Sequence, residues 1–310
     1  MRSSTVELRR TRSAHAPEVI LKVLTAVATA IILLMLAIIL VDIAMGGLKV
    51  VSWEFISAAP RNGMTAGGIF PALFGTVALT LLMTVAAVPA GVATAIYLTE
   101  YAPAQSWLAR AIRVCIANLA GVPSIVFGLF GLGFFVSTVG RAVDRAAYDG
   151  KLTYAQPSLI WASLTLAILT LPVVVIATEE ALRAVPREYR DASLALGATK
   201  LQTVTRVVLP EALGGVLTGS ILAISRGAGE VAPIMFTGAA YFLPYLPSHL
   251  NDQFMNLSYH VYVLATQSPD VDRTKPLLYG TVFVLLLLTF LLNLVAVLIR
   301  ARTRARLQGT

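Results

Sequence analysis

The sequence predicts an all-α protein that crosses a membrane six times. Of its 310 residues, 57% are hydrophobic and only 13% are charged. A soluble domain usually has about 25% charged residues, and a core of this size cannot hide such an excess of apolar side chains. Six stretches are also long and apolar enough to cross a hydrocarbon layer about 30 Å thick. Lipid is therefore the expected solvent for much of the surface.

The first predicted span covers residues 19–45 and contains an uninterrupted apolar run from Ala26 to Val41. A secretory signal has an apolar run of only about 7–15 residues and a small-residue cleavage site. No clear cleavage site follows this run. We therefore expect a retained anchor over residues 19–46, behind a basic tail of residues 1–18.

The other five predicted spans are residues 70–98, 114–139, 158–178, 212–242 and 277–299. Lysine and arginine are distributed unevenly between the segments that connect them. Fifteen lie on the side of both tails and of the loop between the fourth and fifth spans, and seven lie on the other side. The positive-inside rule then places both termini in the cytoplasm. The basic net charge is thus a topology signal, and no nucleic-acid partner is expected.

The loop between the fourth and fifth spans, residues 184–210, has strong local signals. Pro186 suits the first turn of a helix, where its missing N–H would be unpaired anyway. Gly197 suits a helix end with positive φ, and Thr199 and Gln202 have the spacing of a capping box. The pattern predicts two short helices that meet at Gly197, with Pro210 separating the second of them from the fifth span.

This loop resembles the coupling loop of ABC importer permeases. In that family the loop usually reads E-A-A, three residues, G, nine residues, I-x-L-P. The same spacing is kept here by Asp191, Ala192, Ser193, Gly197, Leu209 and Pro210. Asp191 replaces the Glu and Ser193 replaces the second Ala. The resemblance implies that the loop docks on a separate ATPase subunit and receives its motion.

Further segments are similar to the phosphate-importer permeases, and among these to the A-type subunit. They are residues 121–128, 178–186 and 226–233, and the end of the last span from Asn293. The resemblance covers residues 67–302, leaves 303–310 as a basic cytoplasmic tail, and implies the type I (MetI-like) permease fold in a cell inner membrane. It also implies a homologous C-type permease, an ATPase dimer and an extracytoplasmic phosphate-binding protein as partners.

The chain has no ATP-binding loop of its own. Such a loop needs G-x-x-x-x-G-K-[ST], and the one Gly-Lys pair, Gly150-Lys151, is followed by Leu152 and lacks the earlier glycine. We expect no cofactor on this chain, with ATP and magnesium on the partner ATPase, and no enzymatic activity. A single cysteine and three scattered histidines predict no metal site.

The fifth predicted span contains Gly215 and Gly219, whose spacing favours close packing against another helix. It also contains two opposite charges. Arg226 is near its middle and Glu230 follows four residues later. An arginine at the bilayer centre costs about 2.5–3.5 kcal/mol, so it should face the bundle interior or a wet cavity. Its guanidinium fork matches phosphate oxygens. We expect Arg226 to line the substrate path and Glu230 to weaken its hold on phosphate; the alternative is a permanent pair that only fixes packing.

Hydroxyl groups are weaker candidates for the path. Thr76, Thr80 and Thr84 recur every four residues on one helix face. Ser124 follows Pro123, where the helical hydrogen bonds are interrupted. These hydroxyls offer neutral donors to an anion, although a membrane threonine often bonds its own backbone carbonyl.

Two other functions stay open from the sequence. A permease of another ABC importer, for sulfate, molybdate, phosphonate or amino acids, would share the coupling loop. An ion-coupled secondary transporter would use Glu230 as a proton site and would need no ATPase.

Overall fold

The computed structural model describes residues 15–308 apart from 104 and 269. Within that part, six helices are long and apolar enough to cross a membrane, which confirms the predicted number. They are Glu18–Leu48, Phe70–Tyr101, Ser124–Ala147, Leu159–Ala184, Lys200–Gly229 and Val271–Arg302. The tails predicted at 1–18 and 303–310 fall partly outside the described residues, at 1–14 and 309–310.

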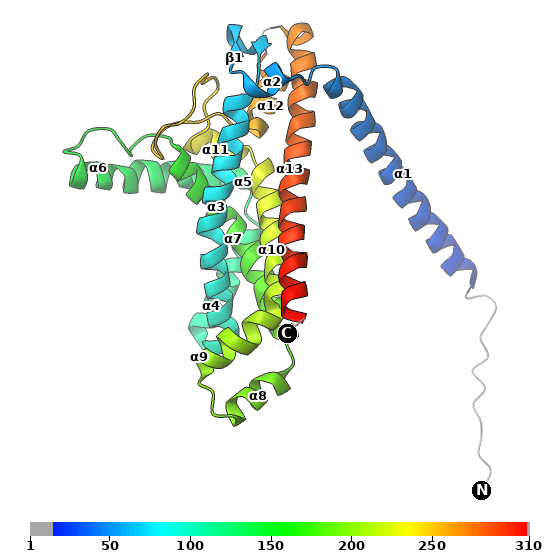
Figure 1. Cartoon of the computed structure of the whole chain (residues 1–310), viewed down its shortest axis with the longest axis vertical. Coiled ribbons are helices and arrows are strands. Elements are labelled where there is room, and N and C mark those ends of the chain that lie inside the picture. Colours follow the sequence, from blue (N-terminus) through cyan, green and yellow to red (C-terminus); the bar gives the residue numbers. More distant parts are fainter. Residues whose placement is uncertain (1–14, 104, 269, 309–310) are drawn as a thin grey trace.

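Three long helices make the centre of the bundle: α3 (Phe70–Ile96), α7 (Leu159–Ala184) and α10 (Leu209–Gly229) (Figure 1). In α7, 67% of the most apolar 18-residue window is buried. A Cβ on Gly215 would overlap the Cβ of Ala181, and one on Gly219 would overlap that of Ala177. The close helix contact expected from these two glycines is therefore present, and it joins α10 to α7.

The end of the bundle opposite the 184–210 loop is closed by short elements (Figure 1). They are α2 (Trp53–Ser57), a hairpin of β1 (Pro60–Arg61) and β2 (Ala66–Gly67) joined by the turn η2 (Asn62–Met64), and α12 (Leu257–Thr266). Phe55 and Leu257 are buried together in this region. The two connecting segments on this side are thus ordered, and α12 is a helix that the sequence analysis did not identify.

The third span starts later than predicted and is preceded by a separate helix. α4 (Trp107–Ala120) ends at Gly121, and α5 (Ser124–Phe130) begins after Pro123, so residues 114–120 are not part of the span. Pro123 has no N–H for a helical hydrogen bond and disfavours the helical conformation at the residue before it. From Ser124, α5 continues through the π-helical η4 (Gly131–Gly140) into α6 (Arg141–Ala147).

The fifth span is also shifted from the predicted residues 212–242. Its helix runs unbroken from Lys200 to Gly229, through α9 (Lys200–Thr203), the π-helical turn η5 (Val204–Val208) and α10. Pro210 therefore does not separate a short helix from the span, because the wider turn of η5 accommodates its ring and its missing N–H. The helix stops at Glu230, whose backbone is extended, and α11 (Ala232–Thr237) is separate.

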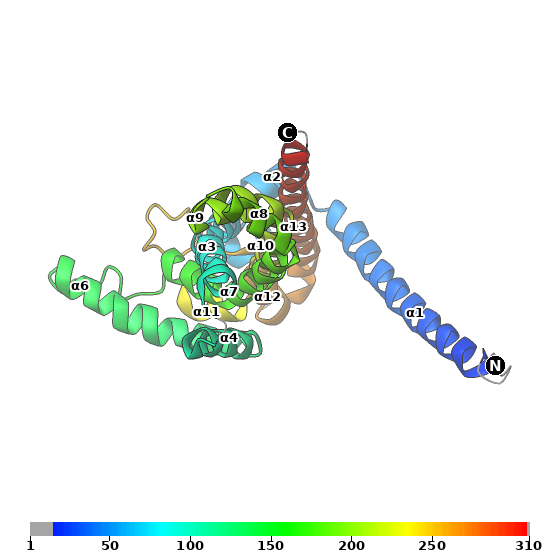
Figure 2. The ribbon, with the colours of Figure 1, turned by 90° about the horizontal axis from the view of Figure 1, so that it is seen from below.

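Two helical arms leave the bundle on opposite sides (Figures 1 and 2). One is the continuous helix α5–η4–α6, which projects sideways from the bundle. The other is α1 (His15–Leu48). The C-terminal end of α1 contacts α13 (Val271–Gln308), and there the Tyr279 hydroxyl of α13 donates to Asp42 Oδ2 of α1 at 2.9 Å. None of the most apolar 18-residue window of α1 is buried. Lipid or another chain must cover this surface.

Candidate functional site

The 184–210 loop forms two helices that meet at a glycine, as predicted. α8 (Arg187–Ala195) follows Pro186, which is its N-cap rather than a first-turn residue, and Gly197 has a φ of 82°. Glycine adopts this left-handed conformation without strain. At the start of α9 the predicted capping box is present: the Thr199 N–H donates to Gln202 Oε1 at 2.8 Å, and the Gln202 N–H donates to Thr199 Oγ1 at 3.3 Å.

Three large apolar side chains are exposed at the tip of this loop. No residue of α8 is buried, and Leu194, Leu196 and Leu201 are exposed, Leu196 by 90%. These leucines are available for contact with another protein. The motif residues Asp191 and Ala192 are exposed on the same helix.

The remaining motif residues hold the loop together at its base. Ser193 Oγ lies 2.9 Å from Thr203 Oγ1, which joins α8 to α9. Leu209 and Pro210 are half-buried at the start of α10, beside the fully buried Val208. The structure therefore divides the motif between an exposed tip and a packed base.

One arginine connects this loop to the bundle. Arg190 of α8 donates from Nη2 to Glu100 Oε1 at 2.7 Å, and its guanidinium also donates to the carbonyls of Leu182 and Val185, both at 2.8 Å. These carbonyls are at the C-terminal end of α7, where the helix offers no backbone donor. Glu100 lies in the π-helical turn η3 (Tyr97–Tyr101), which continues α3. Arg190 thus joins α8, α7 and the end of α3.

Glu100 and Arg190 are not among the residues that the sequence predicts to be functional. The side chains are only 8% and 18% exposed, so the pair is largely removed from water. One signal for it was visible: Glu100 is a carboxylate directly at the end of an apolar span, and such a charge needs a partner. The identity of that partner, 90 residues away, was not readable from the pattern.

Arg226 and Glu230 lie side by side at the opposite end of α10. The Arg226 Nε donates to Glu230 Oε1 at 3.4 Å, and the side chains are 47% and 19% exposed. In the described part of the chain the Arg226 guanidinium makes no other hydrogen bond. An arginine this exposed in an apolar helix requires a polar surrounding in the membrane. The structure brings the predicted pair together and leaves most of its donors available.

The three threonines are placed differently. Thr76 and Thr80 are buried, Thr84 is half-buried, and each hydroxyl donates to the carbonyl four residues earlier, at 2.6–2.7 Å. Thr76 Oγ1 also accepts the N–H of Leu257 at 2.8 Å, which fastens α12 to α3. Ser124 is half-buried at the start of α5. A contact of these hydroxyls with substrate stays a prediction.

These features agree with comparisons to known proteins. Residues 87–308 match the family described as the binding-protein-dependent transport system inner membrane component, and the chain belongs to this family. It is therefore a multi-pass inner-membrane component of a transport system, as the coupling-loop resemblance implied.

Individual relatives are more specific. The phosphate transport system permease protein PstA 1 of Mycobacterium tuberculosis is 36% identical over 243 residues, which cover 78% of this chain and 72% of the relative. The corresponding protein PstA of Yersinia pestis is 32% identical over 250 residues, 81% of this chain and 78% of the relative. A probable ABC transporter permease of Bacillus subtilis, YqgI, is 35% identical over 195 residues, 63% of this chain and 61% of the relative.

Solved structures show the same fold. A bacterial alginate ABC transporter in complex with an alginate-bound periplasmic protein gives a TM-score of 0.64 at 15% identity, over 97% of this chain and 99% of that chain. The MetNI methionine ABC transporter in an inward-facing conformation gives a TM-score of 0.58 at 19% identity, and the match covers 75% of this chain and 94% of that chain. These likenesses confirm the predicted type I ABC importer permease fold.

Proposed function

We propose that this chain is the A-type permease subunit of an ATP-driven importer of inorganic phosphate. The observation that carries the proposal is its similarity, over about three quarters of its length, to proteins named as phosphate transport permeases. The chemistry of the fifth span supports it, because a guanidinium with free donors matches a phosphate oxyanion.

The exposed tip of α8 and α9 is the proposed contact with an ATPase dimer. In this orientation both termini and the loop are cytoplasmic, in agreement with the excess of basic residues on that side. Arg190 would then pass the motion of the loop to α7 and α3, since its guanidinium contacts both. ATP and magnesium belong to the ATPase, and this chain performs no covalent chemistry.

The proposed substrate path runs between this chain and a homologous C-type permease. Arg226 supports this placing, because it is 47% exposed here and needs a polar surrounding inside the membrane. An extracytoplasmic binding protein would deliver phosphate to the end that carries α2 and α12. Phosphate would bind Arg226 in place of Glu230, and Glu230 would recover the guanidinium as phosphate leaves. Thr84 and Ser124 are the half-buried hydroxyls that remain candidates for further contacts.

The test is uptake by the assembled complex in proteoliposomes. We expect ATP-dependent accumulation of radiolabelled phosphate, and a loss of about 10-fold or more in Arg226→Gln, because two charge-assisted hydrogen bonds disappear. Arg110→Gln is the matched control, since Arg110 is an exposed arginine of α4 outside the fifth span. Uptake without an ATPase, or preference for sulfate, molybdate, phosphonate or an amino acid, would contradict the proposal.

A further inference from the structure

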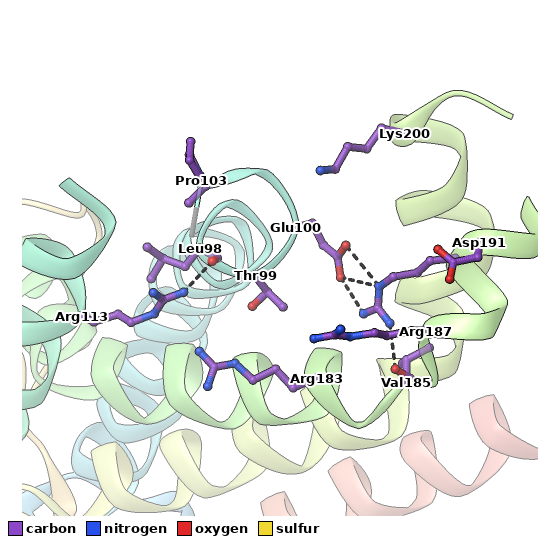
Figure 3. A pocket seen from close by; sticks show the side chains of 12 residues that line it. Leu98, Thr99, Glu100, Pro103, Arg113, Arg183, Val185, Arg187, Asp191 and Lys200 are labelled. Carbon is purple, nitrogen blue, oxygen red and sulfur yellow. Dashed lines mark hydrogen bonds and ion pairs between the residues drawn. The ribbon is translucent and has the colours of Figure 1, made fainter. Parts of the chain in front are cut away.

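A cleft of about 650 Å³ lies between the 184–210 loop and the bundle, beside the Arg190–Glu100 pair (Figure 3). Its walls come from the ends of α3 and α7, from α4, and from α8 and α9. Five basic side chains line it against two acidic ones: Arg113, Arg183, Arg187, Arg190 and Lys200 against Glu100 and Asp191. None of these residues is a proposed contact with the substrate, and Asp191 is the one that also belongs to the coupling-loop motif.

The basic side chains on the bundle side are only partly neutralised. Arg113 Nε donates to Glu179 Oε1 at 3.2 Å, and Arg183 reaches the other oxygen of Glu179 only at 3.5 Å. One carboxylate therefore serves two guanidinium groups. The Arg183 side chain is 58% exposed, so most of its donors face the cleft or water.

On the loop side, Arg187 and Lys200 form no ion pair with the described residues. Arg187, at the start of α8, makes no ion pair or hydrogen bond there. The Lys200 ammonium lies over the Tyr101 ring, 5.4 Å from its centroid. In Figure 3 the guanidinium groups of Arg183 and Arg187 lie on the same side of the cleft, below Thr99.

Thr99 is a second and independent sign of an absent ligand. It lines the cleft, and its hydroxyl oxygen is buried with no hydrogen-bond partner among the described residues. Leaving a buried hydroxyl without a partner costs about 1–3 kcal/mol. A rotation of this side chain toward the cleft would let a bound oxyanion accept a hydrogen bond from the hydroxyl.

We propose that this cleft binds a phosphoryl oxyanion, which bridges Arg183 at the end of α7 and Arg187 at the start of α8, with Thr99 as a neutral donor. Guanidinium forks suit phosphate oxygens. The positive end of the α8 dipole is on the same side, which favours an anion further. Free inorganic phosphate and the phosphate of an anionic lipid headgroup both supply this chemistry.

The bound anion would hold the coupling loop to the bundle alongside Arg190. In the proposed importer this end faces the cytoplasm, where imported phosphate accumulates. The loop would then become harder to move as the product builds up. This regulatory consequence rests on the proposed function, whereas binding of the anion does not depend on which substrate is transported.

The first experiment measures equilibrium binding of radiolabelled inorganic phosphate to the full-length chain in phosphatidylcholine nanodiscs. An Arg226→Gln background removes any contribution from the proposed path. We expect saturable binding that becomes about 10-fold weaker in Arg183→Gln with Arg187→Gln, because two charged donors are lost. Arg110→Gln with Arg206→Gln removes the same charge from exposed positions outside the cleft and should leave binding unchanged.

The second experiment distinguishes the source of the phosphoryl group. The same variants are placed in nanodiscs of mixed phosphatidylcholine and phosphatidylglycerol, and the lipid retained by the chain is quantified by mass spectrometry. Retention of phosphatidylglycerol that is lost only with Arg183 and Arg187 identifies a headgroup as the occupant. Equal effects of the two double variants, or no saturable binding of either probe, overturn the inference. Uptake by Arg226→Gln tests the proposed function separately, so the two can fail independently.

Discussion

Arg190 and Arg226 each face a glutamate, and the two pairs differ in burial, geometry and number of contacts. The Arg190–Glu100 pair has an N–O distance of 2.7 Å and side chains that are 18% and 8% exposed. The Arg226–Glu230 pair has a distance of 3.4 Å and side chains that are 47% and 19% exposed. Arg190 also donates to helix-end carbonyls, whereas Arg226 has the single contact described above.

The difference shows what each pair is suited to do. A guanidinium whose donors are bonded to three elements holds those elements together. Its partners are hard to remove, because loss of one would leave an unpaired charge largely buried from water. A guanidinium with one long contact can exchange its partner for an anion at little cost. The same two residue types therefore form a buried, multiply bonded pair at the loop and an exposed pair with one long contact in the span, and we propose that only the second exchanges its partner.

The largest effect is expected at the Arg190–Glu100 pair. Arg190→Ala leaves Glu100 without its partner and removes the cap from α7, which should cost about 3–5 kcal/mol. Transport per ATP hydrolysed should fall by about 100-fold, because the loop no longer moves the bundle. The measurement compares uptake and ATP hydrolysis in the same proteoliposomes.

Two variants make this prediction sharper. Arg190→Lys keeps the charge without the planar fork and should be intermediate. Arg206→Ala removes an exposed arginine of the same loop and should have little effect. Normal coupling in Arg190→Ala would show that the pair is not the connection.

A third ionisable group, His260, is buried at the end of the bundle opposite the 184–210 loop, and unlike the two arginines it forms no ion pair with the described residues. His260 of α12 is 4% exposed, its Nδ1 has no hydrogen-bond partner in the part of the chain that the structure describes, and burial lowers its pKa from 6.5 to about 4. The folded protein keeps His260 neutral, while the unfolded chain takes up a proton below about pH 6.5. Stability should be fully present above pH 6.5 and fall by about 3 kcal/mol between pH 6.5 and pH 4.

Thermal unfolding of the purified complex as a function of pH checks this. In His260→Phe that component of the pH dependence should disappear. His249→Phe is the control, because its side chain is 77% exposed. An unchanged pH profile in His260→Phe would mean that other groups control acid stability.

The smallest effect is expected at the exchangeable pair. In the proposed path, Glu230→Gln removes the carboxylate that would compete with phosphate for Arg226, so phosphate should bind more tightly and leave more slowly. The apparent KM for uptake and the turnover rate should both fall, each by about 5-fold, which corresponds to about 1 kcal/mol. A rise in KM would instead show that Glu230 helps to bind the substrate.

Features that depend on neighbouring residues were predictable from the sequence. The turn at Gly197 and the Thr199–Gln202 capping box needed only local chemistry, and the spans followed from hydropathy. Helix ends were harder, as two prolines show. The helix ends between Gly121 and Pro123. At Pro210, in contrast, the helix is not interrupted, because the wide turn η5 precedes this proline.

The contacts that define the candidate sites were not predictable in the same way. Glu100 and Arg190 meet only after α3 and α7 have packed. The exposure of Arg226 likewise depends on which face of α10 the other helices cover. Both are consequences of tertiary structure rather than of local pattern.

The unbroken helix from Lys200 to Gly229 connects the 184–210 loop rigidly to the region around Arg226. Thirty residues at 1.5 Å each make a rod of about 45 Å, with the tip of the loop at one end and Arg226 near the other. A tilt of roughly 10° would displace one end by about 8 Å relative to the other, more than the width of a phosphate ion. In the proposed importer, a small displacement of α9 would therefore move Arg226 by a distance comparable with the size of its substrate.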